Sequence, residues 1–87
     1  MKLKYNFVFQ PLHTVTLAIT VGEDAKAFPG IIQLNDTGAE IMQLFLGDMT
    51  VDGAVTCMME EYDADEADIR NAVEGIVSML EEKDLLE

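Results

Sequence analysis

Few residues in this chain could carry out chemistry, and they do not form a group. The single histidine, His13, follows Pro11-Leu12 in a predicted turn, and the single cysteine, Cys57, lies far from it in the sequence. A nucleophile needs an adjacent base and a group that orients that base, and neither residue has such neighbours. Gly30 and Gly38 are not part of a phosphate-binding glycine pattern. We therefore interpret His13 and Cys57 as structural residues and predict no enzyme activity and no cofactor.

The acidic run Asp63–Asp68, with Glu74 at the twelfth position, superficially resembles a calcium-binding loop. Such a loop has an oxygen ligand at its fifth position and a glycine at its sixth, where the chain turns sharply. Here these positions hold Ala67 and Asp68. The run is better explained as the start of a helix, where acidic side chains stabilise the positive end of the helix dipole. We predict no metal site.

Length and composition favour one small domain that spans residues 1–87. With 49% hydrophobic residues, the chain can build a single core of modest stability. One cysteine cannot form an internal disulfide, which favours a reducing compartment, and we expect a cytoplasmic protein. The longest uncharged stretch, Tyr5–Gly22, contains Asn, Gln, Pro and His, so we expect neither a signal peptide nor a membrane span.

The charges are distributed unevenly along the chain. Residues 1–34 hold three lysines and two acidic residues, a net charge of +1, whereas residues 35–87 hold two basic and fifteen acidic residues, a net charge of −13. Proteins that bind nucleic acid need basic side chains on the element that approaches phosphate. We therefore expect no nucleic-acid partner, and we interpret the acidic surface as a solvated face.

The N-terminal third has the alternating pattern of β-strands. Apolar and polar residues alternate from Lys4 to Gln10, and Pro11 is expected to end this strand because it has no N–H to donate. Val15–Val21 alternates in the same way, and Ile31–Leu34 is a third short run of strand-favouring residues. We expect Glu23–Pro29 to be a loop. The short connections favour an antiparallel sheet.

The remainder has the spacing of amphipathic helices. A first helix is expected to start near Asn35–Thr37, where Thr37 and Glu40 have the spacing of a capping box, and to end at Gly47 in the left-handed conformation. Thr50 is a suitable N-cap for a second helix. Two apolar stripes follow at helical spacing, formed by Val51, Ala54, Val55, Met58, Met59 and Tyr62 in the second helix and by Ile69, Val73, Ile76, Val77 and Leu80 in a third. We expect Leu85 and Leu86 to fold back as a tail.

These elements predict an α+β fold that is winged helix-turn-helix-like, with a three-stranded antiparallel sheet followed by three helices. If the third strand, Gly30–Leu34, lies at the edge of the sheet, an extended peptide could add to it as a fourth strand. Ala72, Gly75 and Met79 share one shoulder of the third helix, and this shoulder either forms a shallow groove or packs on the first helix or the hairpin. Gly75 costs about 1 kcal/mol relative to alanine inside a helix, which indicates close approach of another chain or tight helix packing.

The order of several segments resembles the PqqD-like family over essentially the whole chain, and the junction Leu34-Asn35-Asp36-Thr37-Gly38 is the most specific part of this resemblance. The other matching segments are Phe7–Phe9, Val21–Ala25, Gly30–Gln33, Thr50-Val51, Glu61–Asp65 and Leu80–Leu86. The resemblance implies a RiPP recognition element, a module that binds the leader segment of a ribosomally made precursor peptide. It further implies a non-catalytic peptide chaperone that presents the leader to a maturase, commonly a radical SAM enzyme, in natural product biosynthesis such as that of coenzyme PQQ.

Carried over to this sequence, the resemblance places the leader beside the third strand and against the third helix. The predicted peptide-binding residues are Gly30, Ile31, Ile32, Gln33, Leu34, Ala72, Gly75, Ile76 and Met79. Two features depart from the family pattern: apolar Ala72 and Met79 occupy places where charge is common, and no glycine precedes Leu85-Leu86. The first departure favours a more apolar leader.

Two other classes of function share this topology. A winged-helix DNA-binding protein would need basic residues on its recognition helix, and the third helix offers only Arg70 and the terminal Lys83. A self-associating structural module could pair the exposed edge strand with a second copy and form a homodimer.

Overall fold

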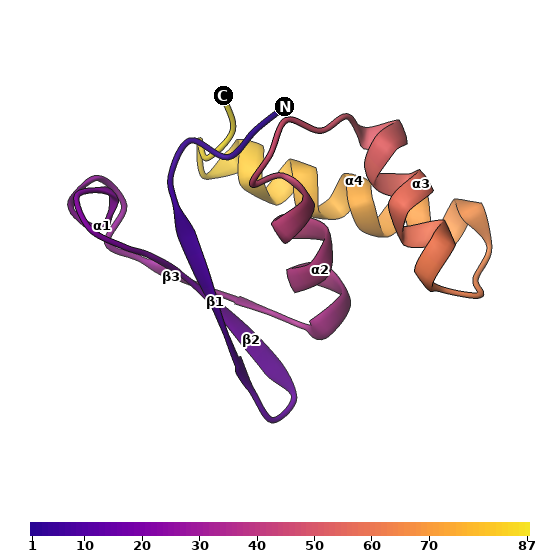
Figure 1. The fold of residues 1–87 in the computed structure, drawn as a ribbon, viewed down its shortest axis with the longest axis horizontal. Helices are drawn as coiled ribbons and strands as arrows, with labels where there is room; N and C mark the ends of the chain where they lie inside the picture. The colour runs from indigo at the N-terminus through magenta and orange to yellow at the C-terminus, as the bar shows by residue number, and fades with distance from the viewer.

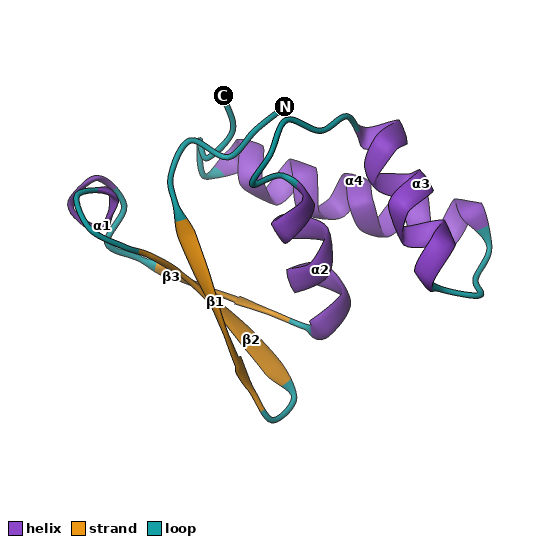
Figure 2. Ribbon diagram, in the orientation of Figure 1, coloured by secondary structure: helices purple, strands orange, loops and turns teal.

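The computed structural model describes residues 1–87. Its elements in chain order are β1 (Phe7–Leu12), β2 (Val15–Thr20), α1 (Asp24–Ala27), β3 (Ile31–Leu34), α2 (Asp36–Leu44), α3 (Val51–Glu61) and α4 (Glu66–Glu82). The three longer helices lie together on one side of the strands (Figures 1 and 2). The predicted α+β arrangement of a three-stranded antiparallel sheet followed by three helices is confirmed, with the short helix α1 as an addition.

The sheet has the order β1-β2-β3, and both strand pairs are antiparallel, so β1 and β3 each leave one edge open. The prediction that the first strand ends at Pro11 is wrong, because β1 continues through Pro11, which pairs with Thr16, to Leu12. An edge strand can contain proline where the missing N–H would face away from the neighbouring strand. Pro11 is such a position, because its pair with Thr16 follows the hydrogen-bonded pair Leu12–Val15 at the turn, so the nitrogen of Pro11 faces the open edge of β1.

The helices cover the face of the sheet on which β2 carries its smaller side chains, beside the larger side chains of Phe7, Ile32 and Leu34. In β2 the residues Thr16, Ala18 and Thr20 are buried, whereas Val15, Leu17 and Ile19 are only half-buried on the opposite face. Ala18 is fully buried and leaves room for α2, which packs against β2. The core therefore lies between this face and the helices.

The segment predicted as a loop, Glu23–Pro29, contains the one-turn helix α1, so that prediction is corrected. Two contacts hold this turn against the sheet. The Asp24 carboxylate accepts a hydrogen bond from the Asn6 N–H at 2.8 Å, and the Thr20 hydroxyl donates to the Phe28 carbonyl at 2.6 Å. The ring of Phe28 also meets that of Phe7 edge to face, at 6.3 Å between centroids.

The first long helix starts differently from the predicted capping box. Asn35 is the N-cap of α2, and its side chain accepts a hydrogen bond from the Gly38 N–H at 2.7 Å, whereas Thr37 lies inside the helix. The prediction that Gly47 ends this helix in the left-handed conformation is also wrong. The helix ends at Leu44, with Phe45 as its C-cap, and Gly22 is the glycine with positive φ.

The other helix ends agree better with the sequence. Thr50 caps α3 as predicted and accepts a hydrogen bond from the Gly53 N–H at 2.9 Å. At the end of α4 the Leu85 N–H bonds to the Leu80 carbonyl and the Asp84 N–H to the Glu81 carbonyl, which together form a Schellman motif. Asp84 has φ 56°, the left-handed conformation that glycine usually supplies at this position.

The chain ends close the core. Leu85 is fully buried, and Leu86 forms a bridge with Leu3 near the N-terminus, so the predicted folded-back tail is confirmed. The largest fully buried side chains are Phe45, Ile41, Met42, Leu80, Leu85 and Val73. No helix has the length and apolar character needed to cross a membrane.

Candidate functional site

The open edge of β3 follows from the hydrogen-bond alternation of the sheet. Leu12 and Val15 flank the two-residue hairpin turn and form a hydrogen-bonded pair. From this pair on, hydrogen-bonded and non-hydrogen-bonded pairs alternate along the antiparallel ladder. Val15, Leu17 and Ile19 therefore direct their N–H and C=O groups at β1. The intervening residues of β2 direct theirs at β3.

The β3 residues opposite these donors and acceptors are Ile32, which pairs with Ala18, and Leu34, which pairs with Thr16. Their backbone groups are used within the sheet. Ile31 and Gln33 carry the N–H and C=O groups that face outward, and neither makes a backbone hydrogen bond in any turn, loop or cap. The edge thus presents two donors and two acceptors to a further strand.

The side chains of the predicted β3 site divide between the two faces of the sheet. Ile32 and Leu34 are buried under the helices, whereas Ile31 is 61% exposed and Gln33 is exposed on the opposite face. Gly30 is exposed just before the strand, and a Cβ there would lie 3.4 Å from the ring of Phe28. These five residues are contiguous, but Ile32 and Leu34 shape the site from inside the core.

Three of the four predicted helix residues line one cavity. Ala72, Gly75 and Ile76 of α4 border a hollow of about 230 Å³. Its remaining walls come from Asn35, Thr37, Gly38, Ile41 and Asn71. Met79 lines none of the cavities and is half-buried against the core further along α4.

Gly38 connects this cavity to the end of β3. A Cβ at Gly38 would lie 3.2 Å from Ile76 Cδ1 and 3.6 Å from Leu34 Cδ2, so β3, α2 and α4 meet here. It would also lie 2.9 Å from the Oδ1 of Asn35, so any side chain at position 38 would displace the side chain that caps α2. The backbone of α2 can therefore approach Ile76 because position 38 is a glycine.

Gly75 has the opposite surroundings. A Cβ built on Gly75 meets no atom within 4 Å. Tight helix packing, one of the two explanations that the sequence left open for this glycine, therefore does not apply. The alternative, close approach of another chain, remains as a hypothesis.

A second cavity of about 200 Å³ adjoins the first and shares Thr37, Ile41 and Ala72 with it. Its other walls are Met58, Tyr62, Ala64, Asp68 and Ile69. Sequence reasoning did not identify this cavity, because its walls come from three helices. Met58 and Tyr62 share an apolar stripe at helical spacing, and such a stripe is typical of a helix face that packs on the core.

A cluster around Glu40 fixes one wall of this region. The Tyr62 hydroxyl donates a hydrogen bond to the Glu40 carboxylate at 2.7 Å, and this bond raises the pKa of Tyr62. Hydrogen bonding to Glu40, together with repulsion between the two carboxylates, raises the pKa of Glu61. Glu40 and Glu61 also line a separate cavity of about 430 Å³ between α2 and α3, which contains Cys57.

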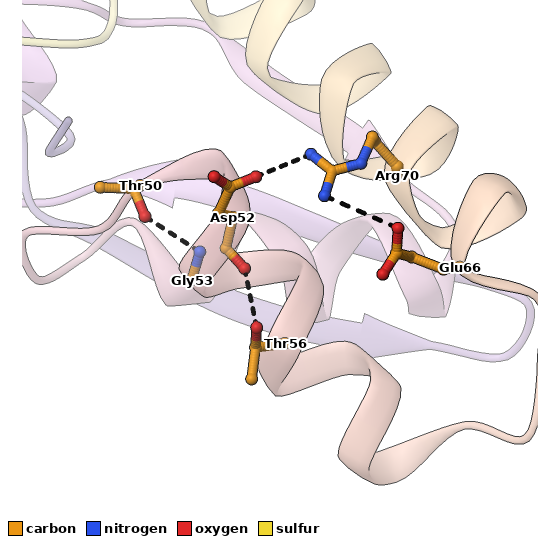
Figure 3. Close-up of polar contacts among 6 residues, drawn as sticks. All are labelled: Thr50, Asp52, Gly53, Thr56, Glu66 and Arg70. Atoms are coloured by element: carbon orange, nitrogen blue, oxygen red, sulfur yellow. Dashed lines mark hydrogen bonds and ion pairs between the residues drawn. The ribbon is translucent and has the colours of Figure 1, made fainter.

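Arg70, the basic residue in the middle of α4, is engaged by acidic neighbours (Figure 3). Its guanidinium lies 2.8 Å from an Asp52 carboxylate oxygen on α3 and 3.9 Å from one of Glu66. The hydrogen bond to Asp52 raises the pKa of Arg70. This arginine therefore contacts α3, and it lines neither the 230 Å³ cavity nor the 200 Å³ cavity.

The candidate catalytic and metal residues are not brought together. His13 lies exposed in the turn between β1 and β2, whereas Cys57 is half-buried on α3, and neither side chain makes a hydrogen bond to another side chain. No group of three or more His, Cys, Asp or Glu side chains is arranged to hold a metal ion. The acidic residues predicted to start a helix do so, with Asp65 as the N-cap of α4 and Glu66 and Asp68 in its first turn.

Comparison with known proteins gives one family and one solved structure. A family model described as coenzyme PQQ synthesis protein D (PqqD) matches residues 15–86. The structure described as TbiB1 in complex with the TbiA(beta) leader peptide is 18% identical in sequence and superimposes with a TM-score of 0.70. The match covers 100% of this chain and 95% of that one, so the two share their fold. No curated protein sequence matches the chain.

Proposed function

From the premise that this chain belongs to the PqqD family, we propose that it is a non-catalytic peptide chaperone that binds the leader segment of a ribosomally made precursor peptide. The leader adds to the open edge of β3 as a fourth strand. The chain then presents the peptide to a modifying enzyme, for which a radical SAM maturase is the proposed partner, in the cytoplasm.

The observation that carries this proposal is the pair of outward-facing peptide groups at Ile31 and Gln33. An exposed strand edge offers main-chain donors and acceptors that an extended peptide can satisfy. The solved structure with the same fold is described as a complex with a leader peptide, which supports the same use of the fold here.

The strength of such a complex can be estimated from its parts. Four main-chain hydrogen bonds at Ile31 and Gln33 contribute about 1 kcal/mol each, net of those lost to water. One or two buried leader side chains add about 1.5–3 kcal/mol apiece. After the cost of ordering the peptide is subtracted, these terms support affinities of about micromolar.

Sequence preference should arise on one face of the added strand. Residues paired across an antiparallel ladder place their side chains on the same face of the sheet. Leader residues opposite Ile32 and Leu34 therefore face α4, where Ala72, Gly75 and Ile76 line the cavity. Leader residues opposite Ile31 and Gln33 face away from the helices. The first set is expected to determine specificity, because the backbone ladder accepts most sequences.

The test is calorimetric titration of the chain with a synthetic peptide that covers the leader of its precursor. Gly75→Glu places a charge on the wall of the cavity, at a position where a Cβ meets no atom within 4 Å. It should weaken binding at least about tenfold, because a carboxylate is poorly solvated beside a bound apolar strand. Met59→Glu on α3 is the matched control, since Met59 is 37% exposed and lines none of the cavities. Equal affinity of both variants and the wild type would remove α4 from the proposed site.

Neither alternative class gains a specific observation. Arg70 is engaged by Asp52 and Glu66, which leaves α4 without a free arginine for phosphate. Self-pairing through the β3 edge would compete with the leader for the same groups. Light scattering with and without the leader peptide separates the two, because self-pairing predicts a dimer that the peptide dissociates.

A further inference from the structure

The cavity between α2, α3 and α4 has the character of a binding pocket for one large side chain. Six of the eight residues that line it are hydrophobic, and its volume is about 200 Å³. An apolar cavity of about 150 Å³ is large enough for benzene. The Tyr62 hydroxyl is held by Glu40 at 2.7 Å, so its phenol ring has a fixed place in the wall.

The cavity adjoins the proposed leader site. It shares Thr37, Ile41 and Ala72 with the cavity that adjoins the end of β3. Both cavities border these three residues, so a peptide that leaves the strand edge beyond Leu34 needs to pass only them to place a side chain in the second cavity. Water in this hollow finds few polar partners, so replacement by an apolar group is favourable.

The surroundings favour positive charge next to the apolar group. Asp68 is the single charged residue among those that line the two cavities, and no lysine or arginine is among them. Asp36 and Asp65 lie beside these walls in sequence, at the starts of α2 and α4. Each helix start carries about half a positive charge, which does not cancel the acidic groups.

We propose that this cavity binds one aromatic side chain of the leader, flanked by basic residues that face Asp68. The proposal rests on the proposed function and deepens it, because it names the chemistry of a second contact beyond the strand edge. An aromatic ring suits walls that contain the Met58 thioether and the Tyr62 ring, since both make favourable contacts with aromatic groups.

The test uses four blocked tripeptides, too short to form the strand ladder, titrated into isotopically labelled protein and followed by NMR. They are acetylated and amidated Lys-Phe-Lys, Lys-Leu-Lys, Lys-Ala-Lys and Glu-Phe-Glu. Lys-Phe-Lys, the Phe probe, should bind saturably with a dissociation constant of about millimolar, and its binding should shift the NMR signals of Ile41, Met58 and Ile69. We expect binding at least about tenfold weaker for the Ala probe and about fivefold weaker for the Glu probe at low salt.

Two matched variants locate the binding. Ala72 lines both cavities, so the ring of Ala72→Phe should fill them and abolish the shifts of the NMR signals. Ala67→Phe adds the same ring at an exposed position of α4 that lines neither cavity, and it should leave these shifts unchanged. Asp68→Asn should reduce the difference in affinity between the Lys-Phe-Lys and Glu-Phe-Glu peptides.

The outcomes separate this proposal from leader binding itself. Equal binding of the Phe and Ala probes, or of the Phe and Leu probes, overturns the aromatic pocket, and equal binding of the Lys and Glu probes overturns the role of Asp68. In each case a full leader peptide that still binds at the β3 edge would leave the proposed function intact. If no leader binds while the Phe probe does, the proposed function fails.

Discussion

Replacing Gly75 by alanine should make the protein more stable and, at the same time, a poorer binder of its leader. A Cβ at position 75 meets no atom within 4 Å, so the added methyl group causes no clash. Alanine is more favourable than glycine inside a helix by about 0.8–1.0 kcal/mol. For a domain of this length we expect the melting temperature to rise by about 4–8 °C.

The same methyl group projects from the wall of the 230 Å³ cavity that Gly75 lines with Ala72 and Ile76. A leader strand that packs on this wall would have to move away or distort, as packed side chains and backbone do when an extra methyl group is forced into a protein core. Overpacking of this kind costs about 1–3 kcal/mol, which corresponds to affinity weaker by about 5- to 150-fold.

Thermal unfolding and calorimetric titration with the leader peptide measure the two effects separately. Ser78→Ala is the matched control, because Ser78 is exposed on the same helix and lines none of the cavities. It should raise stability slightly and leave binding unchanged. If Gly75→Ala lowers stability, the open surroundings of Gly75 are refuted. If it raises stability without weakening binding, the leader does not approach this part of α4.

Three further predictions concern the scaffold. Thr50→Ala should lower the free energy of unfolding in urea by about 1 kcal/mol, because the N-cap bond to the Gly53 N–H is lost; an unchanged midpoint would show that the cap does not contribute. Asp84→Gly should be more stable than Asp84→Ala by about 1 kcal/mol, since both remove the same carboxylate and only glycine tolerates the left-handed φ of 56° without strain; equal stability would argue against that conformation. Glu61→Gln should stabilise the protein near neutral pH but not below the ordinary glutamate pKa of 4.5. Glu40 raises the pKa of Glu61 in the folded state, so the wild type loses stability as the pH rises through that raised pKa, and glutamine removes this loss. Denaturation at several pH values checks this prediction, and a gain in stability that is independent of pH would contradict it.

Local patterns in the sequence were sufficient for the order of elements and for some of their ends. The stripe of α3 and its cap at Thr50 involve residues within one or two helical turns of each other, so no knowledge of the tertiary structure is needed. The strand through Pro11 is different. Whether proline is tolerated depends on which side of β1 has a partner, and that is decided by the position of the strand in the sheet.

The same limit explains the sheet face and the cap of α2. Both faces of β2 carry residues that can be buried, and the small side chain of Ala18 faces inward because α2 packs closely there. Asn35 and Thr37 are both suitable caps, and Gly38, whose backbone approaches Ile76, belongs to the turn that Asn35 caps. Tertiary packing selects among locally equivalent choices.

The candidate site could be predicted in part, from the signals that are local in the sequence. The sequence pointed to the β3 edge and to the shoulder formed by Ala72 and Gly75, because alternation and helical spacing are local signals. It did not distinguish Ile31 and Gln33 from Ile32 and Leu34, since their roles depend on the register with β2. The second cavity could not be predicted, because three helices contribute to it.

The most direct test of the open β3 edge is amide hydrogen exchange, measured residue by residue with and without the leader peptide. The N–H groups of Ile31 and Gln33 should exchange rapidly in the free protein and become protected when the leader binds. Those of Ile32 and Leu34, which are bonded within the sheet, should be protected in both states. Protection of Ile31 and Gln33 in the free monomer, or no change on binding, would contradict strand addition at this edge.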